Sequence, residues 1–118
     1  MAIIVKTKMA QSLVSQLMGE IDNGLLDTWS YDEDGDFTHT GQWEEKGWFR
    51  PVIHEEDVTF IIMGRRGIPM SKMEYSIYHG RFVEALLNHV IIASIDGIEV
   101  TKPGQVEEKL STVTISWL

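Results

Sequence analysis

Apolar residues recur every three or four positions in two stretches of the chain, and this spacing predicts two amphipathic helices. The first is expected over Ala10–Asn23, where Gly24 follows as a residue free to adopt the left-handed conformation that ends many helices. The second is expected over Ser71–Val90, the longest periodic stretch of the chain. Its apolar positions fill one broad arc of a helical wheel: Tyr75, Tyr78, Phe82, Val83, Ala85, Leu86, Leu87 and Val90.

The start of the second helix carries a strong local signal. Ser71 and Glu74 have the spacing of a capping box, in which each side chain accepts a hydrogen bond from the other residue's backbone N–H. Pro69 precedes them and ends whatever structure comes before. Gly80 lies in the middle of this helix at a cost of about 1 kcal/mol relative to alanine. A backbone packed closely against Gly80 would explain that choice.

Alternating apolar residues and tight-turn signals predict a sheet around these helices. Ala2–Thr7 reads as a strand. Asp34-Gly35 is the two-residue signal of a hairpin, which places Tyr31 opposite Thr38. A second hairpin is expected to turn at Glu55-Glu56, between Trp48–His54 and Asp57–Met63. Pro51 cannot donate to a sheet ladder, so we expect its strand to be an edge or bulged there.

Two further segments complete the predicted fold. Asp96-Gly97 is read as a third tight turn, between Ile91–Ile95 and Ile98–Thr101, and Thr112–Trp117 as a terminal strand. Residues 1–118 show no linker and no internal repeat, so we expect one domain. The predicted class is α+β, an antiparallel β-sheet of hairpins with two helices packed on one face.

Composition narrows the function classes. The chain has no cysteine, which excludes disulfides, thiolate zinc sites and cysteine nucleophiles. No apolar run approaches the length of a membrane span or of a signal peptide. We therefore expect a cytoplasmic protein without a cofactor.

The net charge of −8 comes from one part of the chain. Residues 27–57 hold ten acidic residues against Lys46 and Arg50, a net charge of −8, whereas the remaining residues hold eight of each sign. Nucleic acids and anionic membranes attract the opposite charge, so the sequence disfavours both as partners.

The same segment holds three of the four tryptophans, Trp29, Trp43 and Trp48. Aromatic residues beside charge are typical of interface hot spots, and a concentrated negative field speeds the capture of a basic partner. We predict that Trp43 and Trp48 anchor a basic protein partner and that a set of acidic residues steers it: Asp32, Asp34, Asp36, Glu44 and Glu45. The alternative is that the tryptophans pack the core and the acids keep the surface soluble.

Two patterns suggest ion binding but lack specificity. Asp32, Asp34 and Asp36 have the spacing of the first calcium ligands of an EF-hand loop, but Phe37 and Trp43 occupy the positions that require glycine and glutamate. A solvated hairpin turn explains the three acids better. Arg65 and Arg66 precede a helix start and could bind an anion, or pair with the protein's own acids.

The four histidines do not form a recognisable catalytic or metal motif. His79 and His89 lie in the apolar arc of the second helix, about 15 Å apart along its axis, which is too far to share a metal. His39 and His54 lie near carboxylates. They leave open an alternative function as a small hydrolase or a metal-dependent enzyme.

The sequence favours a small acidic protein-binding domain without enzymatic activity. An immunity-type or antitoxin-type inhibitor that covers a basic protein surface would have this charge distribution. The enzyme that uses His39 or His54 is one alternative. A homodimeric structural domain that pairs through an exposed sheet edge is another.

Overall fold

The computed structural model describes residues 2–102, 104 and 106–109, and it confirms an α+β domain in which two helices pack against an antiparallel sheet. The main sheet has the strand order β2-β3-β4-β5-β1-β6, and β7 adds a short parallel pairing to β5. The elements in chain order are β1 (Ala2–Lys6), α1 (Ala10–Asp22), β2 (Trp29–Tyr31), β3 (Phe37–His39), η1 (Gly41–Trp43), β4 (Trp48–Ile53), β5 (Asp57–Gly64), α2 (Lys72–His89), η2 (Ile92–Ser94), β6 (Gly97–Val100) and β7 (Glu107–Glu108).

The sheet has one face turned to the core, as the alternation of apolar residues requires. In the register of β1 with β5, Ile3 lies opposite Phe60 and Val5 opposite Val58, and all four side chains are buried. Phe49 of β4 lies opposite Ile62 of β5 and continues the same buried row. This row forms the floor on which both helices pack.

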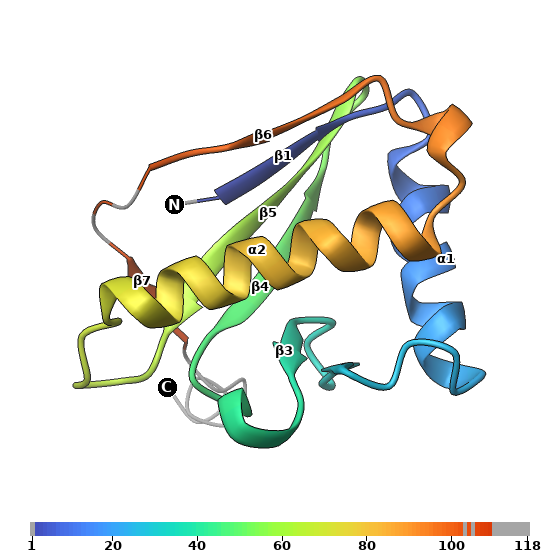
Figure 1. Cartoon of the computed structure of the whole chain (residues 1–118). Helices are drawn as coiled ribbons and strands as arrows, with labels where there is room; N and C mark the ends of the chain where they lie inside the picture. Colours follow the sequence, from blue (N-terminus) through green and yellow to red (C-terminus); the bar gives the residue numbers. More distant parts are fainter. Residues whose placement is uncertain (1, 103, 105, 110–118) are drawn as a thin grey trace, which may run out of the picture.

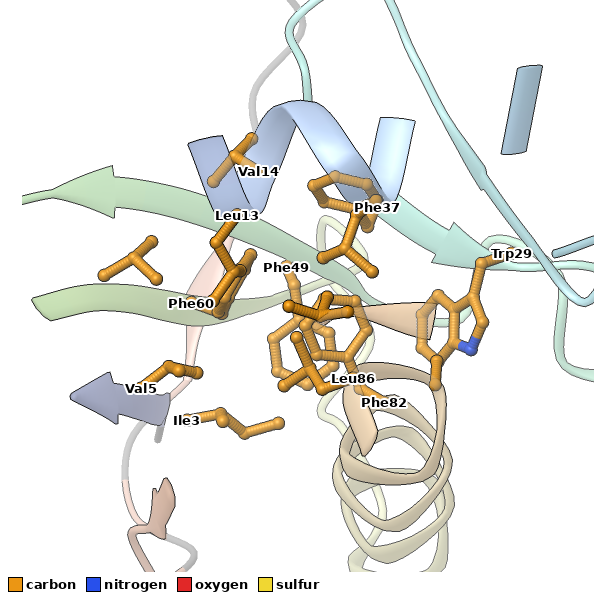
Figure 2. Packing of buried hydrophobic residues seen from close by; sticks show 14 of the residues in the cluster. Ile3, Val5, Leu13, Val14, Trp29, Phe37, Phe49, Phe60, Phe82 and Leu86 are labelled. Atoms are coloured by element: carbon orange, nitrogen blue, oxygen red, sulfur yellow. The ribbon is translucent and has the colours of Figure 1, made fainter. Parts of the chain in front are cut away.

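Both helices contribute to one hydrophobic core. Figure 1 shows α2 running across the strands, with α1 at one end of the sheet. Figure 2 shows Leu13 of α1, Phe82 of α2 and Phe60 of β5 meeting in the same cluster. Phe82 lies with its ring centroid 4.7 Å from that of Phe49 and 4.8 Å from that of Phe60. None of the described helices has the length and apolar character needed to cross a bilayer.

The start of α2 confirms the capping box. Glu74 N–H donates to the Ser71 hydroxyl at 3.0 Å, and Ser71 N–H donates to a Glu74 carboxylate oxygen at 2.9 Å. The expectation for Gly80 is wrong, because a Cβ atom built there would meet nothing within 4 Å. Its cost in the helix has no explanation in the packing of the described chain.

The register predicted for the first hairpin is wrong by one residue. Tyr31 lies opposite Phe37 and Ser30 opposite Thr38, because Asp32 N–H donates to the Asp36 carbonyl and leaves three residues in the loop rather than two. Gly35 takes φ of +78°, the left-handed position that a three-residue hairpin loop places before its second strand. The slip brings Phe37 onto the core face, where its side chain is 1% exposed.

The turn predicted at Asp96-Gly97 does not form a hairpin. The residues before it form η2, and the residues after it form β6, which pairs with β1. Pro51 lies in β4, which is internal in the sheet, but β3 pairs with β4 only at Phe49. The proline therefore lies beyond the end of β3, where no ladder bond is lost. The strand predicted at Thr112–Trp117 lies outside the described residues.

Candidate functional site

The seven residues predicted to bind a partner lie in and around two successive turns. Asp32, Asp34 and Asp36 belong to the turn between β2 and β3, which we call the acidic turn (residues 32–36). Trp43, Glu44 and Glu45 belong to the segment between β3 and β4, which we call the acidic loop (residues 41–47), and Trp48 begins β4. The two turns both carry net negative charge but have different surroundings.

The acidic turn is organised by the side chain of Asp32. One of its carboxylate oxygens accepts hydrogen bonds from the backbone N–H groups of Asp34, at 3.0 Å, and of Asp36, at 3.1 Å. The backbone N–H of Gly35 donates to the Asp32 carbonyl at 2.9 Å. Aspartate favours turns for this reason, since its short side chain bonds to the backbone two residues on.

Two basic side chains pair with three of the four carboxylates of the acidic turn, and the fourth, Glu33, is exposed. The Arg50 guanidinium donates to both carboxylate oxygens of Asp36, at 2.9 and 2.8 Å. Lys109 Nζ lies 3.0 Å from Asp32, 3.1 Å from Asp34 and 2.5 Å from Asp36. Asp36 has no exposed side-chain area, so these charge-assisted bonds are what satisfies its carboxylate.

The pKa values of the two bases reflect this pairing. The hydrogen bonds that Arg50 donates to Asp36 raise the pKa of Arg50. Burial lowers the pKa of Lys109, but the bonds that it donates to Asp36, Asp32 and Asp34 outweigh that effect and raise it. The three carboxylates lie close enough together to hold a metal ion, yet the ammonium of Lys109 lies among them in the place that a cation would take. We therefore interpret the three carboxylates of the acidic turn as structural rather than as a metal site.

Backbone pairing brings Lys109 to the acidic turn. The residues before it form β7, where Glu107 lies opposite Met63 and Glu108 opposite Gly64 of β5. Lys109 N–H donates to the Gly64 carbonyl at 2.9 Å. The ammonium also lies 5.8 Å from the ring centroid of Trp48, within the range of a cation–π contact. Sequence reasoning missed this residue, since a lone lysine near the end of the chain carries no positional signal.

The acidic loop is held from beneath by two hydroxyl groups. Tyr78 of α2 donates from its hydroxyl to the Trp43 carbonyl and accepts from Lys46 N–H at 3.2 Å. The Thr38 hydroxyl donates to the Gly47 carbonyl at 2.8 Å and accepts from Glu45 N–H at 3.2 Å. Four backbone groups of the loop are thus bound to side chains that are themselves buried. This fixes the loop in one conformation.

Glu44 and Glu45 point their charge outward from this fixed loop. Both residues are exposed, and neither carboxylate forms an ion pair within the described part of the chain. Glu45 is the only described residue other than glycine with a positive φ, 53°. Such a conformation is uncommon for residues other than Gly, Asn and Asp, and it persists only where the surroundings impose it.

The two predicted anchors are both partly buried. Trp43 packs its ring against the hydrophobic core from the acidic loop. Trp48 lies in β4 opposite Met63, with Lys109 near its ring. Trp29 is 2% exposed and lies fully in the core, in edge-to-face contact with Phe82. Each of these two tryptophans is therefore partly covered by the protein and partly accessible to solvent.

The two histidines of the alternative enzyme differ in their surroundings. His54 Nδ1 lies 2.7 Å from a carboxylate oxygen of Asp57, at the exposed turn between β4 and β5, and this bond is the main cause of the lowered pKa of Asp57. The His54 side chain is 53% exposed, so this pair lies at the surface. His39 is buried, and its Nδ1 donates to the Thr40 carbonyl at 2.6 Å. Its other ring nitrogen lies near Arg81 and not near a carboxylate of any described residue.

Comparison with protein-family models, with curated proteins and with solved structures found no match for the chain.

Proposed function

We propose that this protein is a small acidic binding domain whose partner is a basic protein surface, in the manner of an immunity-type or antitoxin-type inhibitor. The observation that carries the proposal is the fixed acidic loop, which presents two carboxylates that form no ion pair with any described residue. Trp43 lies in the loop and Trp48 directly follows it, and both are partly exposed. Asp32, Asp34 and Asp36 act indirectly, since they hold the structure beside the loop.

Preorganisation supports a binding role for the acidic loop. A loop that is already fixed loses little conformational entropy on binding, so more of the interaction energy appears as affinity. The Tyr78 and Thr38 hydroxyls supply this rigidity from within the core. The left-handed Glu45 fits the same interpretation, because strained residues that the surroundings hold in place cluster at functional sites.

Charge gives the class of partner. Glu44 and Glu45 repel other acidic surfaces and attract basic ones, and a field of this kind raises association rates steeply at low ionic strength. Lys46 follows them and offsets one of the two charges, so the loop carries a net charge of −1. The protein as a whole carries −8, which adds to the attraction.

Capture on immobilised protein tests the proposal. We expect the protein to retain a strongly basic protein from lysate of its source at about 50 mM salt and to release it at about 500 mM. Mass spectrometry identifies the retained protein, and the purified partner is then titrated directly. The double variant Glu44→Gln/Glu45→Gln should bind at least tenfold more weakly.

The turn between β4 and β5 provides the matched control. Glu55 and Glu56 are also adjacent and exposed, so Glu55→Gln/Glu56→Gln makes the same change in net charge at a different place. This control should bind like the wild type. The proposal fails if no basic protein is retained at low salt, or if both double variants lose affinity equally.

A homodimeric domain is the second candidate. β6 pairs only with β1 among the described strands, so one of its edges is open to a further strand. The edge is short and carries Glu99, which limits pairing. Sedimentation at increasing protein concentration separates the two candidates, because only a homodimer gains mass without a partner.

A further inference from the structure

A polar pocket of about 330 Å³ lies where α2 faces the β2–β3 hairpin. It lies outside the acidic turn and the acidic loop, and the proposed function uses none of its residues. Its volume is at the lower end of the range for small-molecule sites. The residues that matter for its chemistry are Trp29, His39, Arg81, Glu84, Asn88 and His89.

A buried histidine positions the arginine of this pocket. His39 is 5% exposed, and its Nε2 lies 3.4 Å from Nη1 of Arg81. Arginine can only donate, so Nε2 accepts, and the ring hydrogen is on Nδ1, which donates to the Thr40 carbonyl. Burial lowers the pKa of His39, and the neutral ring is the form that can accept from a guanidinium. The side chain that positions Arg81 is thus an uncharged histidine.

In the described part of the chain, Arg50 and Arg65, unlike Arg81, are paired with carboxylates. Arg50 forms two bonds with Asp36, and Arg65 lies 2.7 Å from a carboxylate oxygen of Glu74. Within the described residues no carboxylate pairs with Arg81, although the protein has 18 acidic residues. A positioned arginine whose charge has no internal partner is suited to bind an oxyanion, since its planar fork matches carboxylate and phosphate oxygens.

The rest of the pocket fits an anion that has a carbon skeleton. Asn88 adds an amide about two helical turns beyond Arg81 on the same face of α2, and His89 is oriented by Glu20, whose carboxylate lies 3.1 Å from its Nδ1. Trp29, Leu26 and Ala85 provide an apolar floor. We propose that this pocket binds a small organic oxyanion, with the oxyanion on Arg81 and a short apolar skeleton against Trp29.

Glu84 also lines the pocket and gives the proposal a second, opposite test. Its carboxylate repels an anion bound to Arg81 and competes for the guanidinium. Replacing it with an uncharged residue of the same shape removes both effects. Glu84→Gln should therefore strengthen binding, whereas Arg81→Gln should weaken it.

Titration with defined anions, followed by NMR, tests the proposal. The probes are benzoate and phenyl phosphate, which share the oxyanion and a ring but differ in head group, and inorganic phosphate, which lacks the ring. We expect either aromatic anion to shift the indole N–H of Trp29 and the Nε–H of Arg81 in a saturable way. Inorganic phosphate should bind at least tenfold more weakly than phenyl phosphate.

The variants decide whether the shifts report this pocket. Arg81→Gln should weaken binding at least tenfold, and Arg81→Lys should give an intermediate loss, because it keeps the charge but not the planar fork. Arg66→Gln makes the same charge change in the exposed loop before α2 and should bind like the wild type. The proposal is overturned if neither aromatic anion gives saturable shifts, or if Arg81→Gln and Arg66→Gln bind alike.

Discussion

The acidic turn and the acidic loop are separated by only four residues and both carry net negative charge, yet the fold uses them in opposite ways. In the turn, three carboxylates converge on Lys109, and Asp36 is also bound by Arg50. In the loop, the backbone is bound to buried hydroxyls, and Glu44 and Glu45 remain unpaired among the described residues.

The difference teaches that charge density along a sequence does not identify an interaction surface. A carboxylate that is already bound to an internal base adds little to the field that a partner meets, since the pair is nearly neutral at a distance. The acidic loop is the better candidate because its backbone groups form hydrogen bonds with the buried hydroxyls of Tyr78 and Thr38. These bonds do not use the carboxylates of Glu44 and Glu45, which remain exposed.

The largest effect is expected from removing Asp36. Asp36→Ala leaves Lys109 and Arg50 without their closest partner, and breaking a buried pair in this way should lower the free energy of unfolding by about 3 kcal/mol. Glu44→Ala, which removes an exposed and unpaired carboxylate, should change it by less than about 0.5 kcal/mol. Urea denaturation at pH 7 measures both. Equal losses would mean that the turn and the loop do not differ.

The next effect is the pH dependence of the stability of the fold, which we expect to follow the protonation of His79. Burial lowers the pKa of His79 from 6.5 to about 4. The unfolded ring therefore binds a proton at a higher pH than the folded ring. Its contribution to stability is complete above pH 6.5 and is lost as the pH falls toward 4, by roughly 3 kcal/mol.

Urea midpoints at pH 7 and pH 4.5 measure this loss, and His79→Gln serves as the control. Glutamine cannot take up a proton in this range, so the variant should lose less stability on acidification than the wild type. Burial also lowers the pKa of His39, and the resulting loss of stability at low pH is present in both the wild type and the variant. Identical losses in the two proteins would contradict the role of His79.

A smaller effect is expected from the hydroxyl beneath the acidic loop. Tyr78→Phe removes the bonds to the Trp43 carbonyl and to Lys46 N–H, and it should cost about 1–2 kcal/mol of stability. It should also speed hydrogen exchange at the Lys46 amide. Tyr75→Phe is the matched control, because its hydroxyl binds the Thr101 carbonyl, outside the loop. If both variants leave exchange at Lys46 unchanged, the loop is not held by Tyr78.

The smallest effect on the free energy of unfolding is expected from glycine substitutions in the acidic loop. Glycine adopts a φ of 53° without strain, so Glu45→Gly should raise the free energy of unfolding by about 0.5 kcal/mol, even though the carboxylate is lost. Glu44→Gly, at a φ of −57°, gains nothing and should lower it. Denaturation curves of the two variants give the sign. A loss of stability in Glu45→Gly would show that its conformation is not strained.

The parts of the fold that local sequence decides were predictable. The capping box of Ser71 and Glu74 fixes the start of α2 through contacts three residues apart, and the alternation of apolar residues identifies the core strands. The first hairpin was missed by one residue because Asp34-Gly35 suits both two-residue and three-residue loops. The bonds of the Asp32 side chain select the longer one.

The electrostatics of the candidate site depended on contacts that the sequence does not reveal. Lys109 reaches Asp36 across 73 positions, and the pairing follows from where β7 meets β5. Tyr78 lies in the apolar arc of α2, so its ring was expected in the core, but its hydroxyl has a separate role under the acidic loop. Side chains that combine an apolar body with a polar end are hard to assign from periodicity alone.

The most direct test of the account is the salt dependence of the association rate with the captured basic partner, compared between two variants with equal charge. Glu44→Gln/Glu45→Gln should show a slower and less salt-dependent rate than the wild type, because it removes the unpaired charge. Asp32→Asn/Asp34→Asn makes the same change in net charge outside the acidic loop, and it should keep a rate within about twofold of the wild type, because we expect those carboxylates to bind Lys109 rather than the partner. If the aspartate variant instead loses the salt dependence and the glutamate variant keeps it, the assignment of the turn to structure and of the loop to binding is wrong.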